Sequence, residues 1–280
     1  MAHPQIAAFA RLAKQTDAPE RTIAGQTTLL ARTMHDIRHD PLHDEIVVAN
    51  QFAQAILTFA GNADGETPPR RVIQGSRTQL IRPERLDIDP VHNEIVVPNS
   101  DSVVVFAREA QGNVAPIRVI RGPKTLLRGS NAIAVDPVNN VIVAASQVRP
   151  PGRPQSTYTP AANALLVFDR TAAGDVAPLR VIQGDRTGLQ LINQLQVYPP
   201  KGWIVATQST TDLDAEPPDI FVGVWSIWND GDIPPRWRIA GPNSRLKKPR
   251  GVALNPRNKE LIVADMRLNA VLTYSVPALF

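Results

Sequence analysis

Apolar and polar positions alternate in short stretches along the whole chain, and the stretches recur. A β-branched run follows a polar, proline-containing turn five times, as IRHDPLHDEIVVAN, DIDPVHNEIVVPN, AVDPVNNVIVAAS, QVYPPKGWIVATQ and ALNPRNKELIVAD. Short apolar runs bounded by Pro, Gly, Asn and Asp are typical of β-strands. The 26 prolines are dispersed along the chain, which argues against long helices. The pattern therefore predicts an all-β protein.

Two further segments share this period. An apolar segment ending in an aromatic residue occurs as AILTF, VVVF, LLVF, IFVGVW and AVLTY, and PRRVIQG has the counterparts PERTIAG, PIRVIRG, PLRVIQG and PRWRIAG. The aromatic residue precedes the proline by ten residues in every copy that has both. A constant spacing inside a repeat of variable length indicates a rigid unit with length changes confined to loops. Each repeat reads as four short antiparallel strands, which is the sequence signature of a β-propeller.

We expect a single β-propeller domain over residues 1–280, built from four-stranded antiparallel blades. First and second strands occur five times, third strands six times and fourth strands five times, so five blades are favoured and six are the alternative. The fourth strand near Thr22 and Ile23 would close the ring by pairing with the C-terminal strands, which leaves an N-terminal third strand at 6–9 surplus. Such an unpaired strand offers a route to self-association. The expected blades are 31–80, 81–127, 128–189 and 190–246, with 1–30 and 247–280 closing the ring.

The stretch MHDIRHDPLHDE, residues 34–45, would place His35, His39 and His43 on one face if it were helical. The repeat aligns Pro41 with the turn prolines of the other copies, so the stretch reads as strand, turn and strand. His39 then takes an apolar position of the first strand and His43 a turn position. One tetrahedral zinc cannot bind all three, and only His35 remains a functional candidate.

Runs such as AVDPVNNVIVA and LLVFDRTAAGDVAPLRVIQG resemble the NHL-type blades of TolB-like propellers, particularly those of secreted bacterial proteins. The resemblance covers nearly the whole chain and favours an extracytoplasmic location. The N-terminal segment MAHPQIAAFARLAKQ does not have the pattern of a signal peptide, and no apolar run is long enough for a membrane span. The resemblance specifies the fold and leaves the function open, because propellers serve both as binding modules and as enzymes.

Polar residues gather at two positions of the repeat that we expect on one face, at the mouth of the central channel. This face carries the connectors from fourth to first strands and the loops from second to third strands, and it is the default binding site. Two interpretations are open: the residues cap strand ends, or they line a pocket for a polar ligand or a cation. The candidates are His35, Glu84, Asn131, Asn193 and Arg250 before the first strands, and Asn50, Asn99, Ser146, Gln208 and Asp265 after the second strands.

Positive charge is concentrated on the same face. The five connectors carry a net charge of +8, whereas the whole chain carries +4. The candidate anion-binding residues are Arg82, Lys124, Arg128, Lys247 and Lys248. Such a face suits an acidic polysaccharide, a phosphorylated ligand or an acidic protein surface. Nucleic acid is disfavoured, because only 5% of the residues are aromatic and no stacking platform accompanies the basic residues.

Two loops on this face are longer than their counterparts, at 147–163 and 208–219. They carry opposite charges, which allows two interpretations: one wall of a binding site, or neutral surface insertions. The charged and aromatic residues concerned are Arg149, Arg153 and Tyr158 in the first loop and Asp212, Asp214, Glu216 and Asp219 in the second.

Two functions remain. The first is a non-enzymatic binding scaffold that uses the channel mouth and requires no cofactor, because no nucleophile elbow, zinc-binding helix or phosphate loop appears. The second follows from the similarity to gluconolactonase and streptogramin-lyase propellers, which implies a hydrolase or lyase dependent on Ca²⁺ or another divalent cation. Glu84, Asn50, Asn99 and Asp265 would then be the metal ligands by position. The chain has no cysteine, which excludes disulfides and thiolate chemistry.

Overall fold

The computed structural model describes residues 4–32, 34–147, 163–209 and 220–280. In these ranges the chain forms β-strands and short 3₁₀ turns and no α-helix. The fold is a β-propeller of five antiparallel blades, which confirms the predicted class. No described helix has the length and apolar character that a membrane crossing needs. The chain forms two compact units, 1–97 with 104–117 and 98–103 with 118–280.

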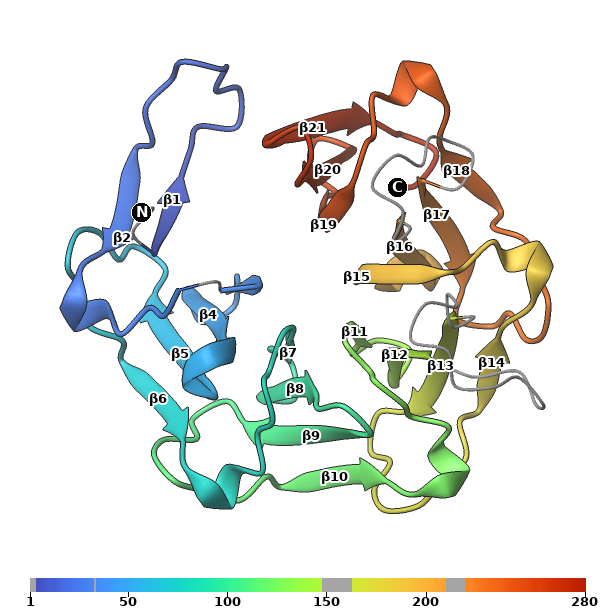
Figure 1. The fold of residues 1–280 in the computed structure, drawn as a ribbon, viewed down its shortest axis with the longest axis horizontal. Helices are drawn as coiled ribbons and strands as arrows, with labels where there is room; N and C mark the ends of the chain where they lie inside the picture. Colours follow the sequence, from blue (N-terminus) through green and yellow to red (C-terminus); the bar gives the residue numbers. More distant parts are fainter. Residues whose placement is uncertain (1–3, 33, 148–162, 210–219) are drawn as a thin grey trace. The chain divides into compact units, whose positions relative to one another are not determined.

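The first unit contains a complete blade whose strands pair in the order β3, β4, β5 and β6, drawn in blue and cyan in Figure 1. The central strand β4 reads as a nearly continuous apolar run because both of its faces are covered. The unit also holds a hairpin of β1 and β2 and most of the next blade. The strands are β1 (Gln5–Ala8), β2 (Arg21–Ala24), β3 (Asp36–Asp40), β4 (Glu45–Asn50), β5 (Ala55–Ala60), β6 (Arg71–Gln74), β7 (Asp87–Asp89), β8 (Glu94–Pro98) and β9 (Ser102–Ala107).

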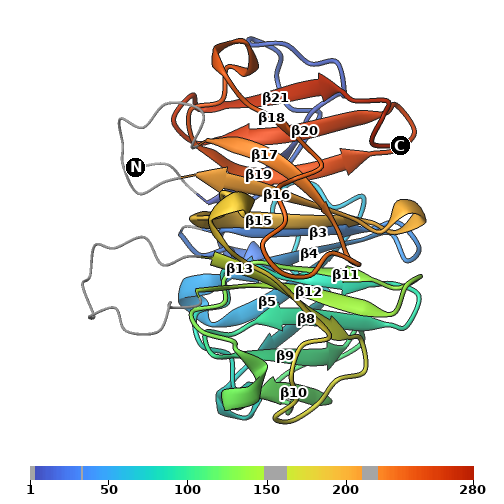
Figure 2. The same ribbon diagram turned by 90° about the vertical axis from the view of Figure 1, so that its right-hand side faces the viewer.

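The second unit contains β10, two four-stranded blades and a three-stranded blade. Figure 2 shows the sheet of β15 to β18 stacked on that of β19 to β21. Apolar side chains such as Val205, Val222, Val252 and Val263 fill the space between these two sheets. The strands are β10 (Arg118–Arg121), β11 (Ile133–Asp136), β12 (Val141–Gln147), β13 (Asn163–Asp169), β14 (Arg180–Ile182), β15 (Leu191–Tyr198), β16 (Trp203–Ser209), β17 (Phe221–Ser226), β18 (Trp237–Ile239), β19 (Pro249–Asn255), β20 (Glu260–Asp265) and β21 (Ala270–Ser275).

Strand pairing at the two ends of the chain differs from the predicted closure. The strand that contains Thr22 and Ile23, β2, pairs with β1, and β21 pairs with β20 as the last strand of its sheet. A hairpin is favoured over pairing with a distant strand, because closing a short loop costs less conformational entropy. The N-terminal third strand is therefore not surplus but the partner of β2.

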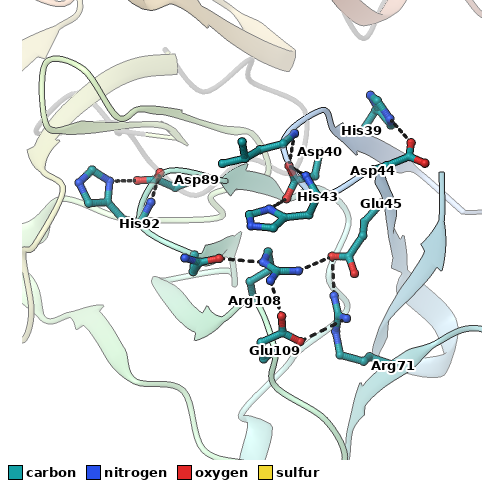
Figure 3. A network of polar contacts seen from close by, with 12 residues as sticks. His39, Asp40, His43, Asp44, Glu45, Arg71, Asp89, His92, Arg108 and Glu109 are labelled. Carbon is teal, nitrogen blue, oxygen red and sulfur yellow. Dashed lines mark hydrogen bonds and ion pairs between the residues drawn. The ribbon is translucent and has the colours of Figure 1, made fainter.

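The histidine-rich stretch forms β3, a turn and the start of β4, as predicted. His43 lies in the turn, where its Nδ1 is 2.8 Å from the buried Asp40 Oδ2. His39 was predicted at an apolar position facing the blade, and this is wrong. Its side chain is 56% exposed and its Nε2 lies 3.4 Å from Asp44 Oδ1 (Figure 3). The reason is that β3 turns its charged residues Asp36, Arg38 and Asp40 inward.

Figure 3 also shows a buried ion cluster around Glu45 at the start of β4. Glu45 Oε2 accepts hydrogen bonds from Arg71 Nη2 at 2.6 Å and Arg108 Nη1 at 2.8 Å. Glu109 joins both arginines from the exposed side. Burial by itself would raise the pKa of Glu45, but the hydrogen bonds and charges of the two arginines lower the pKa below its ordinary value.

We expect Glu45→Gln to lower the free energy of unfolding by about 3 kcal/mol at pH 7, because it removes the buried counter-charge of two half-buried guanidinium groups and leaves them only the exposed Glu109. A carboxylate with a lowered pKa contributes stability above its unfolded-state pKa and loses it as pH falls through its folded-state pKa. The difference between the variant and the wild type should therefore shrink below about pH 4. Urea unfolding followed at pH 7 and at low pH measures this.

Glu109→Gln is the matched control, because the Glu109 side chain is 64% exposed although it contacts the same arginines. It should change the stability by no more than about 1 kcal/mol. Equal effects of the two substitutions would show that burial of Glu45 does not matter to the cluster.

Candidate ligand-binding site

All five connectors from fourth to first strands begin with the same local structure. A glycine with φ between 82° and 139° ends the strand, and a single helical turn follows. A hydroxyl three residues after the glycine donates to the glycine carbonyl at 2.6 Å and accepts from a leucine N–H at 3.1 to 3.3 Å. These hydroxyls belong to Thr28, Thr78, Thr125, Thr187 and Ser244, all buried. The connector is therefore held in one conformation before it reaches the next first strand.

Four of the predicted site residues after the second strands accept hydrogen bonds from the backbone of these connectors. Asn50 Oδ1 accepts from Ala31 N–H at 2.9 Å, and Ser146 Oγ accepts from Arg128 N–H at 2.9 Å. Gln208 Oε1 accepts from two backbone N–H groups of its connector in the same way. Asp265 accepts from four, those of Lys247, Lys248, Arg267 and Leu268. Asn99 instead contacts Ser102 in its own loop.

The predicted residues before the first strands lie in two groups. In the second unit, Arg250 Nη1 donates to Asn193 Oδ1 at 2.9 Å, so the structure brings this pair together. Asn131 Nδ2 donates to the Ile192 carbonyl at 3.3 Å. In the first unit, Glu84 Oε1 accepts from Gln51 Nε2 at 2.8 Å, and His35 is exposed.

Three of the four candidate metal ligands make hydrogen bonds of their own within the described chain. Asn50 and Asp265 direct their side-chain oxygens at backbone N–H groups, and Glu84 is bound by Gln51. Among the described residues, no group of three or more His, Asp or Glu side chains could hold a metal ion. The cation of the enzymatic alternative stays a prediction.

The second unit contains a cavity of about 710 Å³ beside the connector that follows β10, which we call the connector pocket. Arg121 Nη2 donates to Ser102 Oγ at 3.3 Å, and the Gly129 N–H donates to Asp101 Oδ1 at 3.0 Å. The Arg128 carbonyl accepts from the Gln147 N–H at 2.8 Å. The lining residues are Asp101, Arg121, Gly122, Pro123, Leu127, Arg128, Gly129 and Gln147.

Two exposed arginines and one carboxylate give the connector pocket a net positive charge. The Asp101 carboxylate accepts a hydrogen bond from the Gly129 N–H, and both arginines are exposed. Next to the pocket residue Gly129, the buried Ser130 hydroxyl has no hydrogen-bond partner among the described residues. The arrangement offers donors and positive charge, which suits an anion or a polar ligand.

Of the predicted anion-binding residues, only Arg128 lines the connector pocket. Arg82 and Lys124 are exposed, and Lys247 and Lys248 are half-buried on the connector that Asp265 fastens. Sequence reasoning missed Arg121, Asp101 and Gln147. The repeat alignment could have indicated Arg121, because the other copies of PRRVIQG have Gln74, Gln183, Ala24 and Ala240 at this position.

The charged and aromatic residues predicted for the two long loops lie outside the described residues. They are Arg149, Arg153, Tyr158, Asp212, Asp214, Glu216 and Asp219.

The chain has similar folds among solved structures but no similar sequence among curated proteins. A chain in the crystal structure of a nidogen and laminin complex aligns with a TM-score of 0.64 and 13% identity, over 99% of this chain and 88% of that one. Kuenenia stuttgartiensis hydrazine synthase aligns with a TM-score of 0.62 and 12% identity, over 94% and 69%. No family model and no curated protein matches. These likenesses show the fold alone, and the resemblance to NHL-type repeats stays a prediction.

We expect Thr187→Val to lower the free energy of unfolding by about 1–3 kcal/mol, because a buried carbonyl and a buried N–H lose their shared partner while the side-chain shape is kept. Thr16→Val is the control, since Thr16 is an exposed loop residue, and it should stay within about 0.5 kcal/mol of the wild type. Urea unfolding provides the comparison. Equal stability of both variants would contradict a structural role of the connector hydroxyls.

Proposed function

We propose that the protein is a non-enzymatic β-propeller that binds an anionic ligand in the connector pocket. The observation that carries the proposal is the pair Arg121 and Arg128 beside a cavity of about 710 Å³. Guanidinium groups bind carboxylate, sulfate and phosphate through two parallel hydrogen bonds, and they stay charged at every physiological pH. Two arginines at one cavity therefore select for negative charge.

The backbone around the cavity supports the same ligand class. Gly129 has positive φ and no side chain, so a ligand can approach the connector backbone closely there. The connectors carry a net charge of +8 on a chain of net charge +4, which concentrates anions near this pocket. A similar fold in a nidogen and laminin complex agrees with an interaction role, as an analogy at the level of fold.

A binding role fits this site better than cation-dependent hydrolysis. The described pocket lining contains one carboxylate, Asp101, and no histidine, so it offers no pair of groups for acid and base catalysis. The predicted cation ligands Asn50 and Asp265 serve to hold connectors.

Calorimetric titration with inorganic phosphate tests the proposal. We expect saturable binding at low ionic strength that weakens as salt is added. Arg128→Gln should weaken it by about tenfold or more, because a charge-assisted hydrogen bond is lost while the Arg128 backbone contacts remain.

Arg186→Gln is the matched control, because Arg186 lies exposed on the next connector and does not line the pocket. Its phosphate affinity should equal that of the wild type. A similar loss in both variants would indicate unspecific attraction to a basic face, and the absence of saturable binding would remove the proposal.

A further inference from the structure

Backbone hydrogen bonds within the second unit hold three polar residues around the connector pocket. The Gly129 N–H donates to Asp101 Oδ1 at 3.0 Å, and the next connector residue, Ser130, donates its N–H to the same short loop at 2.7 Å. From the end of β12, the Gln147 N–H donates to the Arg128 carbonyl at 2.8 Å. The positions of Asp101, Arg128 and Gln147 in the pocket lining are therefore fixed relative to one another.

The Asp101 carboxylate is a lining group that a simple anion does not explain. It lines the same cavity as Arg121 and Arg128, and within the described chain it forms an ion pair with neither. Its Oδ1 accepts from the Gly129 N–H and, at 3.5 Å, from Ser100 Oγ, while no described residue donates to Oδ2. A negative charge in the lining repels an anion that carries no other group. Because a carboxylate only accepts hydrogen bonds, a ligand that pairs with Oδ2 must present an O–H or an N–H.

Gln147 supplies a second polar group at the same place. Its amide carbon and oxygen lie 3.2 Å from the position that a Cβ on Gly129 would take, so Gln147 and Asp101 both lie at Gly129. Among the described residues, none hydrogen-bonds the Gln147 side-chain amide. An amide donates and accepts hydrogen bonds, as a hydroxyl does. A carboxylate and an amide at one place therefore suit neighbouring hydroxyls on a ligand.

A ligand hydroxyl fits this lining better than a ligand ammonium group. The two arginines leave the lining with a net positive charge, which repels an ammonium group and leaves a neutral hydroxyl unaffected. The cavity of about 710 Å³ lies within the roughly 300–1,000 Å³ of pockets for whole small molecules, and inorganic phosphate would fill little of it. Pro123 adds an exposed apolar ring to the lining, which suits the C–H face of a sugar ring.

We infer that the ligand of the connector pocket is a sugar that carries an anionic group, a carboxylate or a phosphate. Arg121 and Arg128 bind the anionic group, and Asp101 and Gln147 bind hydroxyls of the ring. The inference rests on the proposed binding of an anion in this pocket and adds the rest of the ligand. A neutral sugar lacks the charge that the arginines select, and a bare anion lacks the hydroxyls that offset the charge of Asp101.

Calorimetric titration of the full chain compares ligands that differ in one kind of group. We expect glucuronate to bind about tenfold more tightly than cyclohexanecarboxylate, which has the ring and the carboxylate without hydroxyls. Glucuronate should exceed glucose, which has no charge, by at least the same factor. Glucose 6-phosphate compared with inorganic phosphate tests the other anionic group in the same way, and the larger gain identifies the group that the pocket prefers.

The same titrations separate failure of this inference from failure of the proposed function. If phosphate binds saturably but neither sugar binds more tightly than its counterpart without hydroxyls, the pocket binds anions and the sugar is wrong. Tighter binding of alanine than of glucuronate would show that the ligand donor is an ammonium group, which also contradicts the inference. If none of these ligands binds, phosphate included, the proposed function falls as well.

Asp101→Asn tests the hydroxyl contact directly. Asparagine keeps an oxygen for the Gly129 N–H and replaces Oδ2 by an NH₂ group, which cannot accept from a hydroxyl. We expect glucuronate binding to weaken by about fivefold or more, whereas inorganic phosphate should bind more tightly because a repelling charge is gone.

Asp185→Asn is the matched control, because Asp185 is an exposed carboxylate on the next connector and its loss changes the net charge equally. Both affinities should stay at their wild-type values. Tighter binding of glucuronate as well as phosphate in Asp101→Asn would show that Asp101 only repels anions, and this would overturn the inference.

Discussion

The structure depends on the backbone conformation of one glycine at the end of each fourth strand. Its positive φ turns the chain out of the strand, and its carbonyl receives the hydroxyl that holds the connector. At four of the five glycines, the absence of a Cβ lets a side chain of the following repeat pack against the glycine and bind the connector backbone. One residue without a side chain therefore links a strand, its connector and the neighbouring repeat, and any other residue would break all three contacts.

This rigidity determines where a ligand can bind. The connectors are held by buried hydroxyls on one side and by Asn50, Ser146, Gln208 and Asp265 on the other, so their outer side chains are presented from a fixed backbone. The side chains that do this structural work have few free donors or acceptors left. A ligand must be recognised by positions that vary between repeats, such as Arg121 and Arg128. The polar residues common to the repeats are thus less informative about function than the exceptions to the repeat.

The sequence was sufficient to predict the strands and the blade repeat, because alternation, turn prolines and constant spacing are local features. It did not predict the features that depend on strand register or on which strands pair. His39 was placed on an apolar face because its counterparts are apolar, yet β3 buries Asp36, Arg38 and Asp40, which find partners such as Asp87 on β7. The pairing of β2 could not be predicted, since β1 and β21 carry the same pattern. The connector pocket was missed because Asp101 and Gln147 meet the connector only in three dimensions. The motif G-x-x-[T/S]-x-L was readable in all five copies and would have revealed the connector hydroxyls.

A contact that recurs in a repeat protein shows which of its parts can vary. Four fourth strands and their connectors bind a glycine and the polar residue after it at nearly the same distances, although the polar residue varies between Glu, Asn and Asp. Because the polar residue varies, the backbone pairing and the glycine conformation account for most of this contact, and the side chain adds a preference for charge. Departures from an otherwise regular repeat, such as Arg121 at the pocket, are therefore where this fold departs from a purely structural role.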